Sequence, residues 1–278
     1  QSSPLLMVKH ALSTVATRYL VTALLVVQSA LWTRLLTPEG RGVYAKLQAG
    51  QGLLILLLGL GLTSGIVYFA SSGKLSRGKL WGLAHRLVGL GALVTGVLLV
   101  VALVVPSLDF LFARGHATPF FLAYFFFSFV GAQYQLAFNA FLSADQCFPE
   151  LNRIELWATL LRLGLVALAW VLNSGPGMLM ALFVLDFLAH TTKTLLFGRA
   201  FRRLGIRAET TSWREARPVI TYSFGLYALY VMQFSYQRID IWLIEKWDGL
   251  APLGLYSCAL GLAQYLTILP MAPNSVLM

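Results

Sequence analysis

The chain has 278 residues, of which 58% are hydrophobic and 12% are charged, and its formal net charge at pH 7 is +10. Soluble domains hold about 45–50% apolar and about 25% charged residues, so this composition excludes an ordinary soluble protein. Apolar runs of about twenty residues recur along the chain, and each can cross a ~30 Å hydrocarbon core as a helix. We therefore expect an all-α membrane protein, a polytopic bundle of about eight transmembrane helices.

The expected spans are separated by turns that contain Gly, Pro or charged residues. The second span includes the GxxxG step Gly61–Gly65, which favours close helix packing. The fourth is dense in Phe, and the seventh is rich in Tyr and Gln. In chain order the expected spans cover residues 11–36, 46–70, 80–105, 119–143, 154–172, 177–200, 218–244 and 253–278.

A polar stretch at 199–217 holds six arginines and separates the sixth span from the seventh. We interpret it as a cytoplasmic connector, because cytoplasmic loops of membrane proteins are rich in Lys and Arg. The positive charge is explained in the same way, so no nucleic acid partner is predicted. The expected division is a six-helix lobe over 1–200, a basic connector over 201–217, and the first two helices of a truncated second lobe over 218–278.

A short motif occurs twice, once where the second span opens and once where the eighth opens. Gly42-Val43-Tyr44-Ala45 corresponds to Gly254-Leu255-Tyr256-Ser257, an offset of 212 residues. We interpret this as an internal repeat. Because six spans precede the connector, an even number, the two copies have the same orientation. The repeat is therefore expected to be parallel, with its axis along the membrane normal.

The residues around these motifs resemble the oligosaccharide (O-antigen/polysaccharide) flippases of the multidrug/oligosaccharidyl-lipid/polysaccharide exporter superfamily. The resemblance is carried by LLTPEGRGVYA at 35–45 and by RIDIWLIEKWDGLAPLGLYSCALGLAQYLTILP at 238–270. It implies two six-helix lobes around a central cavity. It also implies movement of undecaprenyl-diphosphate-linked oligosaccharide across a bacterial inner membrane by alternating access. The implied partners are the lipid-linked oligosaccharide, membrane lipids and other polysaccharide-assembly membrane proteins.

Charged residues within the spans should avoid lipid, because a charge at a helix centre costs about 2.5–3.5 kcal/mol on insertion scales. Asp186, His190 and Lys193 share one face of the sixth span, and a polar face of the seventh runs from Tyr230 to Asp240. Two such faces favour a hydrated cavity. We expect substrate contacts from Arg18, Arg162, Arg238, Tyr230 and Gln233, and we expect Asp186, His190 and Asp240 to be candidates for a proton or coupling ion.

Other interpretations of these residues stay open. Arg18, Arg86 and Lys193 lie near the cytoplasmic ends of their spans, where long side chains can reach the headgroups. Arg238 and Asp240 can pair with each other or meet the outer interface. The tyrosines of the seventh span can pack, or they can stack on sugar faces.

Enzyme motifs are lacking in the sequence, with no phosphate-binding glycine loop, HExxH or nucleophile motif. Cys147 and Cys258 define no disulfide or metal framework, so we predict no cofactor. The chain starts at Gln1 and stops at Met278 inside an apolar run, so we expect a fragment. The leading hypothesis is a flippase with a basic cavity for the diphosphate. The alternative is a multidrug/cation antiporter, whose cavity should be acidic or apolar. A membrane-embedded glycan polymerase or ligase would need a sizeable outer loop.

Overall fold

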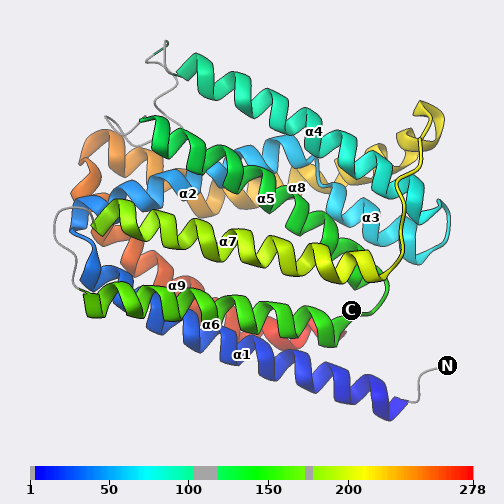
Figure 1. The fold of residues 1–278 in the computed structure, drawn as a ribbon, viewed down its shortest axis with the longest axis horizontal. Helices are drawn as coiled ribbons and strands as arrows, with labels where there is room; N and C mark the ends of the chain where they lie inside the picture. The colour runs from blue at the N-terminus through cyan, green and yellow to red at the C-terminus, as the bar shows by residue number, and fades with distance from the viewer. Residues whose placement is uncertain (1–3, 103–104, 106–117, 173–177, 278) are drawn as a thin grey trace.

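The computed structural model describes residues 4–102, 105, 118–172 and 178–277, which form a bundle of long helices packed side by side (Figure 1). These residues contain no strand. Five of the helices are long and apolar enough to cross a membrane, and the bent pair α2 and α3 can form a sixth span. The expected all-α polytopic membrane protein is therefore confirmed. The helices are α1 (Pro4–Leu35), α2 (Pro38–Gly59), α3 (Leu62–Ser71), α4 (Arg77–Ala102), α5 (Pro119–Ala144), α6 (Phe148–Leu172), α7 (Met178–Arg203), α8 (Trp213–Trp247) and α9 (Leu250–Leu277).

Successive helices run back and forth between two ends of the bundle. The N-terminus, the α3–α4 turn and the α7–α8 connector lie at one end, on the right in Figure 1. The α1–α2 and α8–α9 turns lie at the other. We call these the connector end and the turn end. The alternation is what repeated membrane crossing requires.

The second span begins earlier than expected and is broken in its middle. Thr37 caps α2 by accepting a hydrogen bond from the Gly40 N–H at 3.2 Å, and Pro38 occupies the first helical position. Leu60 and Gly61 then take left-handed backbone conformations, with φ of 48° and 65°, and the axis bends by 47°. An α-helix does not continue through two such residues. The pair α2 and α3 thus replaces the single helix expected over 46–70.

The α7–α8 connector is shorter than the polar stretch in the sequence. Helix α7 continues to Arg203, and α8 begins at Trp213 rather than at Pro218. A capping box explains the early start, since Ser212 and Glu215 each satisfy a backbone N–H of the other. Hydrogen bonds from Lys79 and from Ser212 lower the pKa of Glu215 to about 2.

The connector lies across the start of α4. The Glu209 N–H donates to the Gly78 carbonyl at 3.0 Å, and Arg86 donates to the Thr211 carbonyl at 3.1 Å. A side chain at Gly82 would overlap the Glu209 carbonyl, so the absence of a Cβ there permits this close contact. The connector and the start of α4 are therefore held together at the connector end.

The two copies of the repeated motif occupy corresponding helix junctions. Helix α1 ends at Leu35 and α8 ends at Trp247, whereas α2 begins at Pro38 and α9 begins at Leu250. Both pairs of boundaries keep the offset of 212 residues. In Figure 1, α1 and α8 both run from the connector end to the turn end. The two helix pairs therefore have the same orientation.

Helices α2 and α9 cross near their first turns, and the contact is reciprocal. A side chain at Gly42 would overlap the backbone of Leu250, and a side chain at Gly254 would overlap the backbone of Pro38. Gly42 corresponds to Gly254, and Pro38 corresponds to Leu250. The glycine of each copy therefore packs against the equivalent backbone position of the other copy. This is the pattern of a local two-fold axis between the copies.

Side chains beside the crossing follow the same correspondence but differ in chemistry. Lys46 forms an ion pair with Glu245, and both side chains are buried. At the equivalent positions, Cys258 and Thr33 face each other, with 3.4 Å between Sγ and Oγ1. The local two-fold therefore relates an ion pair to a neutral contact.

Candidate functional site

A cavity of about 440 Å³ lies beside the bend between α2 and α3. We call it the bend cavity, and its walls come from α2, α3, α4, α5 and α8. Its described lining holds no charged side chain. The polar groups are hydroxyls and amides, from Thr63, Ser64, Gln133, Tyr230, Gln233 and Gln237.

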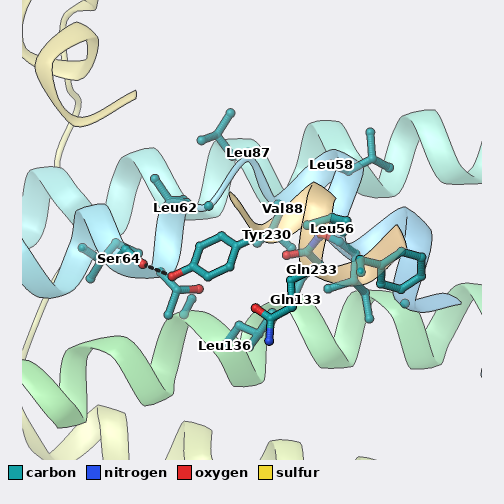
Figure 2. A pocket seen from close by; sticks show the side chains of 18 of the residues that line it. Leu56, Leu58, Leu62, Ser64, Leu87, Val88, Gln133, Leu136, Tyr230 and Gln233 are labelled. Carbon is teal, nitrogen blue, oxygen red and sulfur yellow. Dashed lines mark hydrogen bonds between the residues drawn. The ribbon is translucent and has the colours of Figure 1, made fainter. Parts of the chain in front are cut away.

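Tyr230, Gln133 and Gln233 supply polar groups to the bend cavity from α8 and α5. The Tyr230 hydroxyl reaches from α8 to α3, 2.8 Å from Ser64 Oγ, and Figure 2 shows Tyr230, Gln133 and Gln233 around the same cavity. Gln133 donates from α5 to the Ile55 carbonyl at 3.3 Å. Tyr230 lies near the middle of α8, about 25 Å along the helix from its start. Amides and hydroxyls both donate and accept hydrogen bonds, so this lining suits a polyhydroxylated ligand.

A second cavity, of about 290 Å³, lies among α1, α2, α5, α6 and α7. We call it the charged cavity. It is lined by two basic side chains, Arg162 and Lys193, and two acidic ones, Asp186 and Glu155. Lys193 donates to Glu155 at 2.8 Å. The formal charges in this described lining balance, so the excess of Arg and Lys expected from the sequence is not found.

Arg162 and Asp186 form the centre of the charged cavity. The two side chains make an ion pair, and Asp186 also accepts a hydrogen bond from the Tyr124 hydroxyl at 2.7 Å. Arg162 donates to the Tyr44 hydroxyl at 2.6 Å. Tyr44 belongs to the repeated motif, so the motif connects the α2–α9 crossing to this ion pair.

Two polar atoms beside this ion pair are buried without a hydrogen-bond partner in the described structure. They are Arg162 Nε and Ser128 Oγ, and both residues line the charged cavity. Buried polar groups are normally paired with protein or ordered water. The cavity can therefore hold a small polar ligand or water in contact with the ion pair.

A family model described as "Polysaccharide biosynthesis protein" matches residues 7–278. The chain belongs to the polysaccharide biosynthesis protein family. The match agrees with the resemblance drawn from the two sequence motifs, and it covers the helices of both cavities. No curated protein matches the chain, and no solved structure does.

In this family member, the structure brings several of the expected site residues together. Tyr230 and Gln233 line the bend cavity. Arg162, Asp186 and His190 line the charged cavity. Gln135 approaches His190, with its amide nitrogen 3.2 Å from the His190 carbonyl and 3.3 Å from its ring Nε2.

Three of the expected residues lie outside both cavities. Arg18 is exposed on α1. Arg238 is partly buried and donates to Gln264 of α9 at 3.4 Å. Asp240 accepts hydrogen bonds from the Tyr256 hydroxyl and from the Ile241 N–H, the latter at 2.9 Å. In the part of the chain that the structure describes, Arg238 and Asp240 thus hydrogen-bond to α9 or to their own helix, and no ion pair joins the two.

Sequence reasoning missed several residues that the two cavities use. Glu155 precedes Arg162 by two helical turns, and this spacing places both on one face of α6, so the pattern could have revealed it. Gln133 lies in the Phe-rich fourth span without a regular polar pattern. Tyr124 stands among phenylalanines in the sequence, so it was not recognised as a polar site residue. Only the packing of α5 on α7 places Tyr124 next to Asp186.

Proposed function

We propose that this protein is a flippase that moves undecaprenyl-diphosphate-linked oligosaccharide across the bacterial inner membrane by alternating access. The connector end and the N-terminus lie in the cytoplasm in this proposal, since the connector carries the largest group of arginines. The protein acts as a transporter rather than as an enzyme. Family membership supports a role in polysaccharide biosynthesis. The polar lining of the bend cavity supports a glycan as the transported group.

The observation that carries the proposal is the uncharged polar lining of the bend cavity. Three glutamines, two hydroxyl side chains and Tyr230 surround about 440 Å³. Glutamine amides can bond to many sugar hydroxyls in different orientations, and a tyrosine ring can stack on an apolar sugar face. The described lining has no carboxylate, unlike an acidic cation site, and its amides and hydroxyls distinguish it from a purely apolar drug site. The described lining favours glycan over the cation of a drug antiporter.

Two lobes related by the local two-fold would supply the alternating access. Helices α1 to α7 form the first lobe in this proposal, and α8 and α9 begin the second. The bend cavity has walls from both, because α8 contributes Tyr230, Gln233 and Gln237. Parallel repeats that rock about a central site are a known transporter design.

The charged cavity has a separate role in this proposal. Asp186 and His190 would bind the proton or coupling ion, and Asp240 stays a further candidate on α8. A phosphate would have to displace Asp186 from Arg162 before this arginine could bind the carrier. Arg18 and Arg238, which have no ion pair in the described structure, are therefore the more available cations for the diphosphate.

Complementation of an export-deficient strain tests the proposal. The double variant Tyr230→Phe/Gln233→Leu removes two polar groups from the bend cavity. Each lost hydrogen bond is worth about 0.5–1.5 kcal/mol, so glycan export should fall about fivefold or more at an unchanged protein level. Tyr236→Phe is the matched control, because Tyr236 is 88% exposed on the same helix and lines neither cavity. Full export from the double variant would show that the bend cavity does not contact the glycan.

A further inference from the structure

A groove of about 530 Å³ lies on the outer face of the bundle between α6 and α7, near the connector end. We call it the α6–α7 groove. It shares no lining residue with the bend cavity or the charged cavity. Its apolar walls are formed by Ile154, Trp157, Leu161 and Leu196. Its chemistry is therefore separate from that of the proposed transport site.

The rim of the α6–α7 groove is strongly basic. Arg153, Arg199 and Arg203 line it together with one carboxylate, Glu150. Glu150 accepts hydrogen bonds from Arg203 at 2.8 Å and from Arg153 at 3.1 Å. Arg199 is exposed and makes no ion pair with the described residues. Three positive charges against one negative charge leave the rim with an excess of two.

Charged and apolar residues are separated along the helix axes. Arg153 lies in the second turn of α6, and Arg203 is the last residue of α7. Leu161 lies about 12 Å further along α6 than Arg153, toward the bundle centre. Trp157 lies between them and is 61% exposed. The basic rim therefore sits near the membrane surface, and the apolar walls extend into the hydrocarbon region.

We propose that the α6–α7 groove binds an anionic membrane phospholipid. The phosphate lies at Arg199 and Arg203, which are one helical turn apart, and an acyl chain lies along Trp157, Leu161 and Leu196. Guanidinium groups bind phosphate oxygens through charge-assisted, bidentate hydrogen bonds. Basic pockets between transmembrane helices are suited to such headgroups. Free phosphate would leave the apolar walls unused, so the shape of the groove favours a lipid.

Lipid binding to the purified chain in detergent micelles tests this proposal. Native mass spectrometry would count bound phosphatidylglycerol and phosphatidylcholine, and thermal unfolding would follow the stabilisation by each. Both lipids offer a phosphate, but the trimethylammonium group of phosphatidylcholine brings a positive charge beside the basic rim. We therefore expect phosphatidylglycerol to bind about tenfold more tightly, a difference of about 1.4 kcal/mol. Arg199→Gln/Arg203→Gln should abolish the preference. Trp157→Ala should weaken the binding of phosphatidylglycerol. It should not make the protein prefer phosphatidylcholine.

The matched control is Arg202→Gln/Arg214→Gln, which removes the same charge from two exposed arginines outside the groove. This control should keep the wild-type preference. An equal loss in the control would overturn the proposal in favour of general surface charge. Equal binding of both lipids by the wild type would also overturn it. If inorganic phosphate stabilises the wild type as strongly as phosphatidylglycerol does, the groove is a simple anion site and the lipid proposal is wrong.

Discussion

At the scale of single residues, the pair formed by Arg162 and Asp186 shows how this chain holds charge inside the membrane. The Asp186 side chain is only 8% exposed, and it contacts both Arg162 and the Tyr124 hydroxyl. Removing Asp186 leaves the Arg162 charge without its carboxylate, which costs roughly 1.5–3 kcal/mol because Arg162 is 28% exposed to the cavity. We therefore predict that Asp186→Asn lowers the unfolding free energy by about that amount, measured by denaturation in micelles.

A double substitution separates the charge from the shape of the site. Arg162→Gln/Asp186→Asn removes both charges, so it should be more stable than Asp186→Asn alone. Tyr124→Phe removes only a neutral hydrogen-bond donor and should cost about 1 kcal/mol. If the double variant is no more stable than Asp186→Asn, then lost packing rather than an unpaired charge explains the effect.

At the scale of helices, the crossing of α2 and α9 depends on two glycines. A Cβ at Gly42 or at Gly254 would overlap backbone atoms of the facing helix, and backbone cannot rotate away as a flexible side chain can. Overpacking of this kind costs typically 1–3 kcal/mol. We predict that Gly42→Ala and Gly254→Ala each lower the melting temperature in micelles, with similar effects because the two contacts are equivalent.

Gly164 of α6 provides the matched control for both substitutions. Apart from its own helix backbone, no described atom lies within 4 Å of a Cβ added at this position. Replacing a helical glycine by alanine then stabilises the helix by roughly 0.5–1 kcal/mol. A melting temperature for Gly42→Ala that is equal to or above that of Gly164→Ala would contradict the close crossing.

At the scale of the whole molecule, the contact between Thr33 of α1 and Cys258 of α9 connects the two proposed lobes. Their side-chain atoms are 3.4 Å apart, so a cysteine at position 33 could form a disulfide with Cys258 after a small adjustment. We predict that Thr33→Cys/Cys147→Ser crosslinks on mild oxidation and that glycan export then falls at least about tenfold. Alternating access requires the lobes to move, and the crosslink prevents this.

Two controls separate the crosslink from the substitutions that introduce it. A reducing agent should restore export by Thr33→Cys/Cys147→Ser, and Thr33→Cys/Cys147→Ser/Cys258→Ser should export normally under oxidation. Crosslinking would be followed by the accessibility of free thiols. Wild-type export by the fully crosslinked protein would show that α1 and α9 do not separate during transport.

The amino-acid sequence alone determined the class of the molecule and its order of helices. Long apolar runs must become helices in a membrane, because only a helix satisfies its own backbone hydrogen bonds in hydrocarbon. The repeated Gly-x-Tyr motif predicted corresponding junctions, and the helix boundaries at Pro38 and Leu250 keep that correspondence. Helical periodicity also placed Asp186 and His190 on one face, and both line one cavity. These features depend on local spacing, which can be read along the chain.

Only the tertiary structure decided which polar groups meet. Arg162 of α6 pairs with Asp186 of α7. Tyr124 of α5 contacts Asp186 across 62 residues of sequence, and Tyr44 of α2 contacts Arg162 across 118. The bend at Leu60 and Gly61 also escaped prediction, although it shapes the wall of the bend cavity. Helical spacing gives the face on which a side chain lies, but not the helix that this face contacts. That choice depends on how the whole bundle packs its small residues and pairs its buried charges.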